Sequence, residues 1–197
     1  MTGEETKMKA LVLNGSRTEK EAVNSVSDFL LDSLRKNGDE VEVMVLRNMS
    51  IASCLGCFGC WLKTPGECVI HDAGNELPGK VIQSDFVFLL TPISFGMYSS
   101  ELKKALDRFP CPVLLPFFEK INGEIHHAPR YNKYPTLVAI GALPNSDEES
   151  ENTFTTLVSR NGINLHTKAF STIIYSADTA ETIKQKVIAT LSKAGVQ

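Results

Sequence analysis

The chain of 197 residues is 43% hydrophobic and carries a formal net charge of −3, so it is long enough to bury the core of one domain. It has no dense run of Lys and Arg, which argues against nucleic acid or an anionic membrane as a partner. Residues 1–9 do not resemble a signal peptide and no apolar run reaches the roughly 18–20 residues that span a bilayer, so we expect a soluble cytoplasmic protein.

Short apolar runs alternate with helical patterns along the chain. The expected strands are 9–13, 41–46, 86–90, 136–140 and 169–175. The expected helices are 22–36, 78–85, 99–109, 149–160 and 179–193. Strands that alternate with helices need crossover connections, so the pattern predicts a parallel sheet with ligands at the carboxyl ends of its strands. We expect one domain over residues 1–197, with 110–134 as a long insertion after the third βα unit.

The loop GSRT (residues 15–18) directly follows the first expected strand. Its hydroxyl and N–H groups, with the positive end of the next helix, suit a phosphate, and Asn24 and Ser25 could add donors. The alternative is an ordinary capped turn, because the loop lacks the spacing of a Walker A or dinucleotide motif.

A second candidate loop, TPISFGMYS (residues 91–99), follows the third expected strand. A flat conjugated ring needs apolar or aromatic walls and a few aimed donors, and this segment could supply both. The alternative is a turn that uses Pro and Gly for its geometry while Phe95 belongs to the core.

Four of the five cysteines fall within residues 54–68, after the second strand, and we therefore expect them at the same carboxyl edge. In a reducing compartment such density indicates a metal centre or thiol chemistry before structural disulfides. An iron–sulfur cluster, a zinc ion, and bare thiols or disulfides all stay open. The pair His126 and His127 points to opposite sides of an extended segment, so a hydrogen-bonded loop anchor is favoured over a shared metal ion.

These motifs occur in a characteristic order: the GS loop, CLGCFGCWLKTPGEC at 54–68, TPISFGMYSSELKKALDR at 91–108, and GEIHHAPRY at 123–131. Over about residues 8–175 the chain resembles the flavodoxin-like NAD(P)H-dependent FMN reductases, in the branch that includes the iron–sulfur flavoproteins. The resemblance implies a three-layer α/β sandwich with a five-stranded parallel sheet of order 2-1-3-4-5 and helices on both faces.

The resemblance also assigns residues to FMN. The phosphate loop would use Ser16, Thr18, Asn24 and Ser25. The ribityl chain and ring would lie against Thr91, Pro92, Ile93, Ser94, Phe95 and Gly96, with Gly141 and Ala142 at the ring edge. The compact 4Fe–4S motif of the iron–sulfur branch matches Cys54, Cys57, Cys60 and Cys68.

The implied function is an FMN-dependent oxidoreductase with NAD(P)H as cosubstrate and a small molecule or a protein as electron acceptor. No dedicated catalytic residue is expected, because the flavin N5 accepts the hydride. FMN is favoured over FAD, since a single compact α/β unit has no second element for an adenylate. The alternatives are a cysteine-based redox or metal sensor and a non-catalytic binding protein.

The segment 109–118 is almost wholly apolar, and its three prolines are expected to keep it out of regular structure. An apolar loop of this kind has to be covered, and a partner subunit would cover it. We therefore expect a homodimer or homotetramer. The alternative is that the segment folds back over its own sheet.

Overall fold

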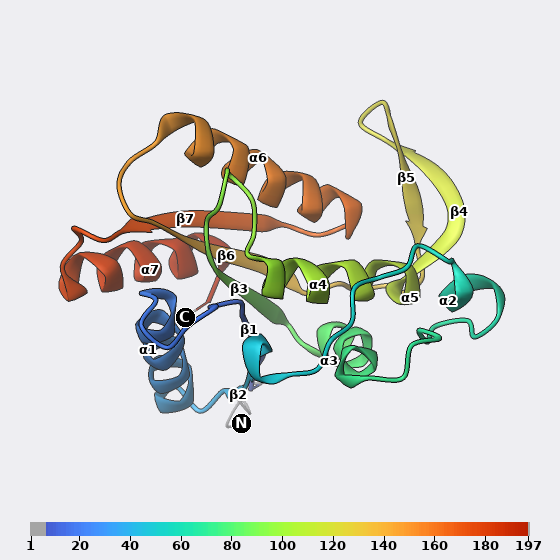
Figure 1. Cartoon of the computed structure of the whole chain (residues 1–197), viewed down its shortest axis with the longest axis horizontal. Coiled ribbons are helices and arrows are strands. Elements are labelled where there is room, and N and C mark those ends of the chain that lie inside the picture. The colour runs from blue at the N-terminus through green and yellow to red at the C-terminus, as the bar shows by residue number, and fades with distance from the viewer. Residues whose placement is uncertain (1–6, 197) are drawn as a thin grey trace, which may run out of the picture.

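The computed structural model describes residues 7–196. Five parallel strands form the central sheet in the order β2-β1-β3-β6-β7 (Figure 1). They are β1 (Lys9–Asn14), β2 (Glu40–Val45), β3 (Phe86–Pro92), β6 (Thr136–Leu143) and β7 (Ala169–Tyr175). Counted along these five strands alone, this order is the 2-1-3-4-5 that the sequence predicts.

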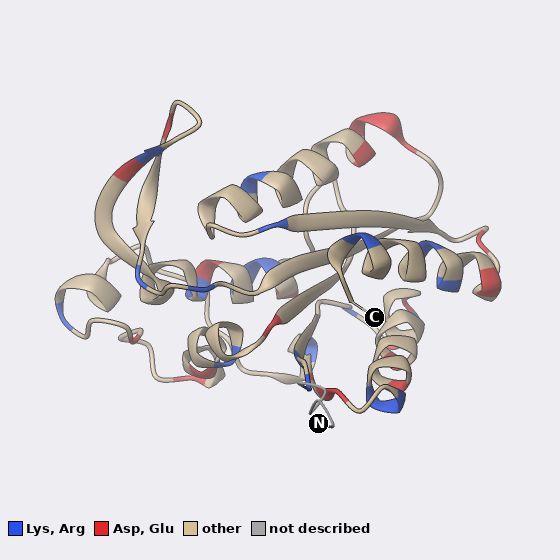
Figure 2. Ribbon diagram, turned by 180° about the vertical axis from the view of Figure 1, so that it is seen from behind, with Lys and Arg blue, Asp and Glu red and all other residues tan. Residues whose placement is uncertain are grey.

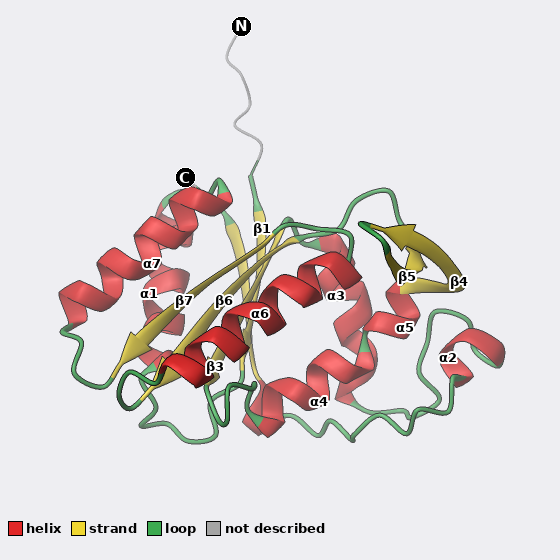
Figure 3. Cartoon of the chain, turned by 90° about the horizontal axis from the view of Figure 1, so that it is seen from above, coloured by secondary structure: helices red, strands yellow, loops and turns green. Residues whose placement is uncertain are grey.

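Helices cover both faces of the sheet (Figure 3). One face carries α1 (Val23–Lys36) and α7 (Ala180–Ala194), and the other carries α3 (Leu77–Gln83), α4 (Ser100–Arg108) and α6 (Glu148–Asn164). Because neighbouring residues of a strand point to opposite faces, β3 feeds both cores, with Phe88 in one and Leu89 in the other. The predicted three-layer sandwich is confirmed.

The element boundaries shift by a few residues from the prediction. β3 and β6 run past the expected ends at 90 and 140, to Pro92 and Leu143, and α6 continues to Asn164 rather than 160. The longer strands bring Thr91 and Gly141 into the sheet, where the register places them opposite each other. The loops that follow β3 and β6, both assigned to FMN in the sequence analysis, therefore leave the sheet side by side.

The expectation that prolines keep residues 109–118 out of regular structure is wrong. The short helix α5 (Pro110–Val113) has proline in its first turn, where no intrahelical N–H bond is lost. An antiparallel hairpin follows, made of β4 (Leu114–Ile121) and β5 (Glu124–Pro129). The β4–β5 register is irregular between Leu114 and Phe118, which accommodates Pro116. The hairpin stands beside the main sheet rather than within it (Figures 1 and 3).

Charged side chains are spread over the surface of the described residues (Figure 2). The acidic group Glu148, Glu149 and Glu151 occupies the first turn of α6, where the helix dipole favours negative charge. Within residues 7–196 there is no helix with the length and apolar character needed to cross a membrane.

The loops that follow β1 and β3 meet at Gly15. Its N–H donates to the Leu90 carbonyl at 2.8 Å, and its carbonyl accepts from the Ser99 hydroxyl at 2.6 Å. A Cβ built on Gly15 would lie only 2.6 Å from the Leu102 Cβ, so the missing side chain is what lets the start of α4 approach the end of β1.

We expect Gly15→Ala to destabilise the protein by about 1–3 kcal/mol, because the backbone on both sides of the added methyl group must move. The matched control is Gly79→Ala in α3, where the nearest atom to an added Cβ is 3.9 Å away and alanine is the better helix former. Urea unfolding of both variants measures the effect. Equal midpoints for Gly15→Ala and the wild type would contradict the packing described here.

Candidate functional site

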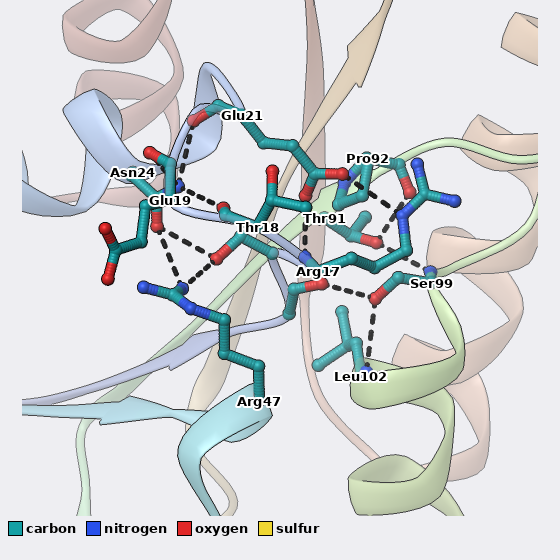
Figure 4. A network of polar contacts seen from close by, with 12 residues as sticks. Arg17, Thr18, Glu19, Glu21, Asn24, Arg47, Thr91, Pro92, Ser99 and Leu102 are labelled. Carbon is teal, nitrogen blue, oxygen red and sulfur yellow. Dashed lines mark hydrogen bonds and ion pairs between the residues drawn. The ribbon is translucent and has the colours of Figure 1, made fainter.

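Three loops gather at the carboxyl edge of the sheet, where parallel α/β folds bind ligands. They follow β1, β3 and β6, and they are tied together by the Ser99–Gly15 bond and by the Ile93 N–H, which donates to the Ala142 carbonyl at 2.8 Å. The structure therefore brings all three predicted FMN segments to one edge. Figure 4 shows the polar network between the first two.

The first loop is organised by Asn24, at the start of α1. Its side-chain amide donates to the carbonyls of Thr18, Glu19 and Glu21 at 2.9 to 3.1 Å, which folds the loop over the helix start. Its Oδ1 accepts from the Ser16 hydroxyl at 2.9 Å. Ser25, predicted to contact the phosphate as well, is exposed, and its hydroxyl donates to the Ala22 carbonyl.

Arg47 completes this corner and was not anticipated from the sequence. It lies in the short 3-10 turn Leu46–Asn48 that follows β2. Its Nη1 donates to the Ser16 hydroxyl and, at 3.3 Å, to the Asn24 Oδ1. Among residues 7–196 no carboxylate lies within ion-pair distance of this half-buried guanidinium, in contrast to Arg17, which pairs with Glu21. The positively charged Arg47 guanidinium is therefore held at this corner by two neutral side chains, those of Ser16 and Asn24.

The second loop is a tight turn in which the backbones of Ser94 and Met97 pair at 2.9 and 3.1 Å. Phe95 and Gly96 at its tip both have positive φ, +51° and +72°, and the Phe95 side chain is 95% exposed. Gly96 is needed for a second reason, because an added Cβ would lie 2.5 Å from the Thr153 Cβ. A strained turn that presents a bare aromatic ring at the ligand edge is typical of a binding site rather than a core.

Buried hydrogen bonds fix the base of this turn. The Thr91 hydroxyl accepts from the Ser99 N–H at 2.8 Å and donates to the Pro92 carbonyl. Gly141 closes the other side, since a Cβ there would lie 2.5 Å from the Ile93 Cδ1. Tyr98 is buried behind the loop, which raises its pKa to about 12, and its hydroxyl accepts from the Asn161 amide at 2.9 Å. The base of the turn is therefore fixed by hydrogen bonds and close packing, while Phe95 at its tip is exposed to solvent.

The cysteine loop, residues 53–69, is closed at its base by a buried ion pair. Arg108, the last residue of α4 and without exposed side-chain surface, donates to the carbonyls of Ala52 and Ile70 at 2.9 and 3.1 Å, one on each side of the loop. Asp72 accepts from Arg108 and from the Ala52 N–H. Burial acts to raise the Asp72 pKa, but the bonds from Arg108, Ala52 and Gly74 together lower it below the usual range.

The same clamp fixes where the cysteine loop begins and ends. The loop leaves the carboxyl end of β2, and its base is held by the last residue of α4. Cys54 and Cys57 are exposed, while Cys60 and Cys68 are half-buried. Within residues 7–196 no three His, Cys, Asp or Glu side chains are arranged to hold a metal ion.

His126 is a hydrogen-bonded anchor of the hairpin, whereas the His127 ring packs against aromatic side chains and its Nδ1 has no hydrogen-bond partner within residues 7–196. The His126 ring is buried, and its Nδ1 lies 2.8 Å from the Asn164 side-chain oxygen in α6. His127 lies between the rings of Trp61 and Phe118, with centroids 4.7 and 4.8 Å away. The short helix α2 (Gly59–Leu62), which carries Trp61, is thereby joined to the hairpin.

Comparison with known proteins agrees with this geometry. An iron–sulfur flavoprotein of Methanocaldococcus jannaschii is 28% identical over 144 residues, 73% of this chain and 67% of the relative. One of Archaeoglobus fulgidus is 34% identical over 101 residues, which are 51% of this chain and 45% of the relative, so the match spans about half of that protein.

Solved structures share the fold. The NAD(P)H:quinone oxidoreductase from Methanothermobacter marburgensis superposes with a TM-score of 0.67 at 13% identity, covering 95% of this chain and 96% of that one. An FMN-dependent NADH-azoreductase from Bacillus anthracis, solved in complex with FMN, gives a TM-score of 0.66 at 13% identity, covering 95% and 98%. The family model of the NADPH-dependent FMN reductases matches residues 8–145. The chain therefore belongs to the NADPH-dependent FMN reductase family.

Proposed function

We propose that the chain acts as one flavodoxin-like domain that binds a single FMN at the carboxyl edge and passes electrons from NAD(P)H to a small-molecule or protein acceptor. The observation that carries the proposal is the corner of Arg47, Ser16 and Asn24, a cation without an acidic partner in the described chain, next to an open aromatic turn. When bound, FMN would supply the hydride chemistry at its N5. The residues of the chain would bind FMN, orient it and shield it from water.

The phosphate end fits the first loop. A doubly charged phosphate seeks charge-assisted hydrogen bonds, and a guanidinium is the side chain best shaped to give them. Arg47 would face it together with the hydroxyls of Ser16 and Thr18, near the N-terminus of α1. Asn24 would hold the loop in shape, and Ser25 would lie at its margin.

The ring end fits the second and third loops. The N–H groups of Phe95 and Gly96 have no protein acceptor within residues 7–196, so both are free to donate to ring atoms. The Ser94 N–H, by contrast, already donates to the Met97 carbonyl. The residues behind the turn, which would support the ring from below, are Thr91, Pro92, Ile93, Gly141 and Ala142, and all but Ala142 are buried. None of these side chains is an acid or a base, so their role would be to position the ring and not to transfer protons.

The cysteine loop does not present a ready site for a cluster. Four thiols are the donors that a 4Fe–4S cluster takes, and relatives of the chain are iron–sulfur flavoproteins by name. Within residues 7–196, however, no three such side chains are grouped to hold a metal ion, and Cys54 and Cys57 lie exposed at the surface. The residues therefore do not fit a cluster as they stand, and no electron-transfer step is assigned to one.

Anaerobic titration of the FMN-loaded protein with NADH and with NADPH tests the proposed activity. We expect at least one of them to bleach the visible flavin absorbance with saturating dependence on its concentration, and a quinone added afterwards to restore it. A protein that binds FMN but is bleached by neither nucleotide would contradict the reductase role while leaving the binding site intact.

Arg47→Ala should weaken FMN binding about 10- to 100-fold, because a hydrogen bond to a charged group contributes about 1.5–3 kcal/mol. Riboflavin lacks the phosphate, so its affinity should not change. Quenching of flavin fluorescence measures both, and the control is Arg35→Ala at the exposed end of α1. An equal loss of affinity for both flavins would place Arg47 away from the phosphate.

We also propose that the protein self-associates through the hairpin, as a homodimer or homotetramer. Phe117, Phe118 and Ile125 are 65–68% exposed, and large apolar side chains that lie exposed on a projecting element mark an interaction surface. Phe109 and Val113, by contrast, are buried in the chain's own core.

Light scattering at micromolar concentration should give a mass of two or four chains, and the double variant Phe117→Asp with Ile125→Lys should give one. The control is Ile188→Lys, an exposed apolar residue of α7 on the far side of the sheet from the hairpin. A wild-type protein that is monomeric at this concentration would rule the interface out.

A further inference from the structure

A cavity of about 340 Å³ lies between α4, α6 and the base of the hairpin. Helices α4 and α6 cover the same face of the sheet, with α5 and the hairpin beside them (Figure 3). The lining includes Leu137, the second residue of β6, so the cavity reaches the amino end of that strand. The loops proposed for FMN leave the carboxyl ends of the strands instead. The cavity is therefore a separate feature, although the Tyr98 side chain that lines it belongs to the segment 91–99.

The walls of the cavity are mainly apolar. The buried side chains among them are Leu106, Phe109, Leu114, Leu137 and Leu165. Such walls attract a ligand because its apolar surface leaves water when it binds. Small-molecule sites usually begin at about 300 Å³, and an apolar cavity of roughly 150 Å³ already holds benzene. A cavity of about 340 Å³ therefore suits a ligand with two fused aromatic rings.

Three polar side chains of the lining keep hydrogen-bonding capacity that the described chain does not use. The Tyr98 hydroxyl accepts from the Asn161 amide at 2.9 Å, but its own proton has no acceptor within residues 7–196. Burial raises the pKa of Tyr98 to about 12, so the hydroxyl keeps this proton at neutral pH. The Asn161 Oδ1 has no donor in the same part of the chain, and the buried His127 Nδ1 has no partner there.

A donor and an acceptor that stand together select for a hydroxyl group. The Tyr98 proton seeks an acceptor and the Asn161 Oδ1 seeks a donor, and only a group that does both satisfies the pair. A hydroxyl does so, whereas a carbonyl oxygen accepts only. Buried polar groups without a partner are costly, so a ligand that supplies one is favoured over water-free apolar contact alone.

The lining also selects against charge. Lys103 and Asp107 are its two charged residues within the described part of the chain, and they form an ion pair with each other while about half-exposed. A charged ligand would have to leave water for apolar walls without a free counter-charge. The cavity therefore favours a neutral ligand.

We propose that the cavity between α4, α6 and the hairpin binds a neutral two-ring aromatic alcohol of the phenol type. Its rings would lie among the leucines and Phe109, and its hydroxyl would accept from Tyr98 and donate to the Asn161 Oδ1. The proposal does not rest on the flavin function, because none of these contacts involves FMN.

Isothermal titration calorimetry of the full-length protein with 2-naphthol at neutral pH tests the site. We expect one molecule to bind per chain, with a dissociation constant on the order of 10–100 µM. Saturating FMN should leave this affinity unchanged, and naphthalene-2-sulfonate, which adds a charge to the same rings, should bind at least about 10-fold more weakly. Displacement of 2-naphthol by FMN, equal affinity for the sulfonate, or no saturation below about 1 mM would each overturn the proposal.

Variants locate the probe. Tyr98→Phe should weaken 2-naphthol binding about 3- to 10-fold because it removes one hydrogen bond, and it should leave the affinity for indole, which has no acceptor for that proton, unchanged. The matched control is Tyr131→Phe, since Tyr131 is exposed and lies outside the lining. Leu157→Trp should fill the cavity and abolish the binding of both probes. Unchanged 2-naphthol affinity in Tyr98→Phe would overturn the assignment even if Leu157→Trp does not fold.

The rival occupant is an apolar side chain of a second copy, such as the exposed Phe117 of its hairpin. Light scattering separates the two, because filling the cavity with Leu157→Trp should leave the mass of the assembly as in the wild type. The double variant Phe117→Asp with Ile125→Lys should bind 2-naphthol with wild-type affinity. A change of mass in Leu157→Trp without any loss of 2-naphthol binding would assign the cavity to a subunit contact and overturn the proposal.

Discussion

The contact between the ends of β1 and β3 at Gly15 sets the geometry of the rest of the ligand edge. The Gly15 N–H donates to the Leu90 carbonyl of β3, and the Gly15 carbonyl accepts from the Ser99 hydroxyl. These two hydrogen bonds tie the first loop to the second. The Ser99 oxygen also accepts from the Leu102 N–H at 3.2 Å and thereby caps α4. The start of α4, the open turn of Phe95 and the corner of Ser16 are consequently fixed to one another by a single buried junction.

Helix α4 extends from that junction to the base of the cysteine loop. Its first residue lies at the ligand edge, and its last, Arg108, closes the cysteine loop with Asp72. A buried guanidinium is costly unless its donors find partners, and Nη1 and Nη2 of Arg108 donate to two carbonyls, a carboxylate and the Asn75 side chain, whereas Nε has no partner within residues 7–196. The helix thus connects two chemically different regions through one rigid element.

The sequence was informative where one local pattern decides the structure. The central strands were predictable because a strand buried on both faces has a continuous hydrophobic sequence, and the edge strand β2 because Val alternates with Glu along it. The hairpin was missed because proline is a poor strand former in general and acceptable where the ladder is irregular, as at Pro116. Arg47 was missed since a single arginine after a strand has no motif, and only the fold places it beside Ser16.

The same reasoning explains why the cysteines were the hardest part to interpret. Spacing along the chain groups Cys54, Cys57, Cys60 and Cys68, but the fold also packs α2, which carries Cys60, against α5, which carries Cys111 and follows α4. The cysteine loop is thus connected to the proposed flavin site in two ways: Arg108 at the end of α4 holds its base at Ala52, and Arg47 of the phosphate corner lies five residues before that base along the chain.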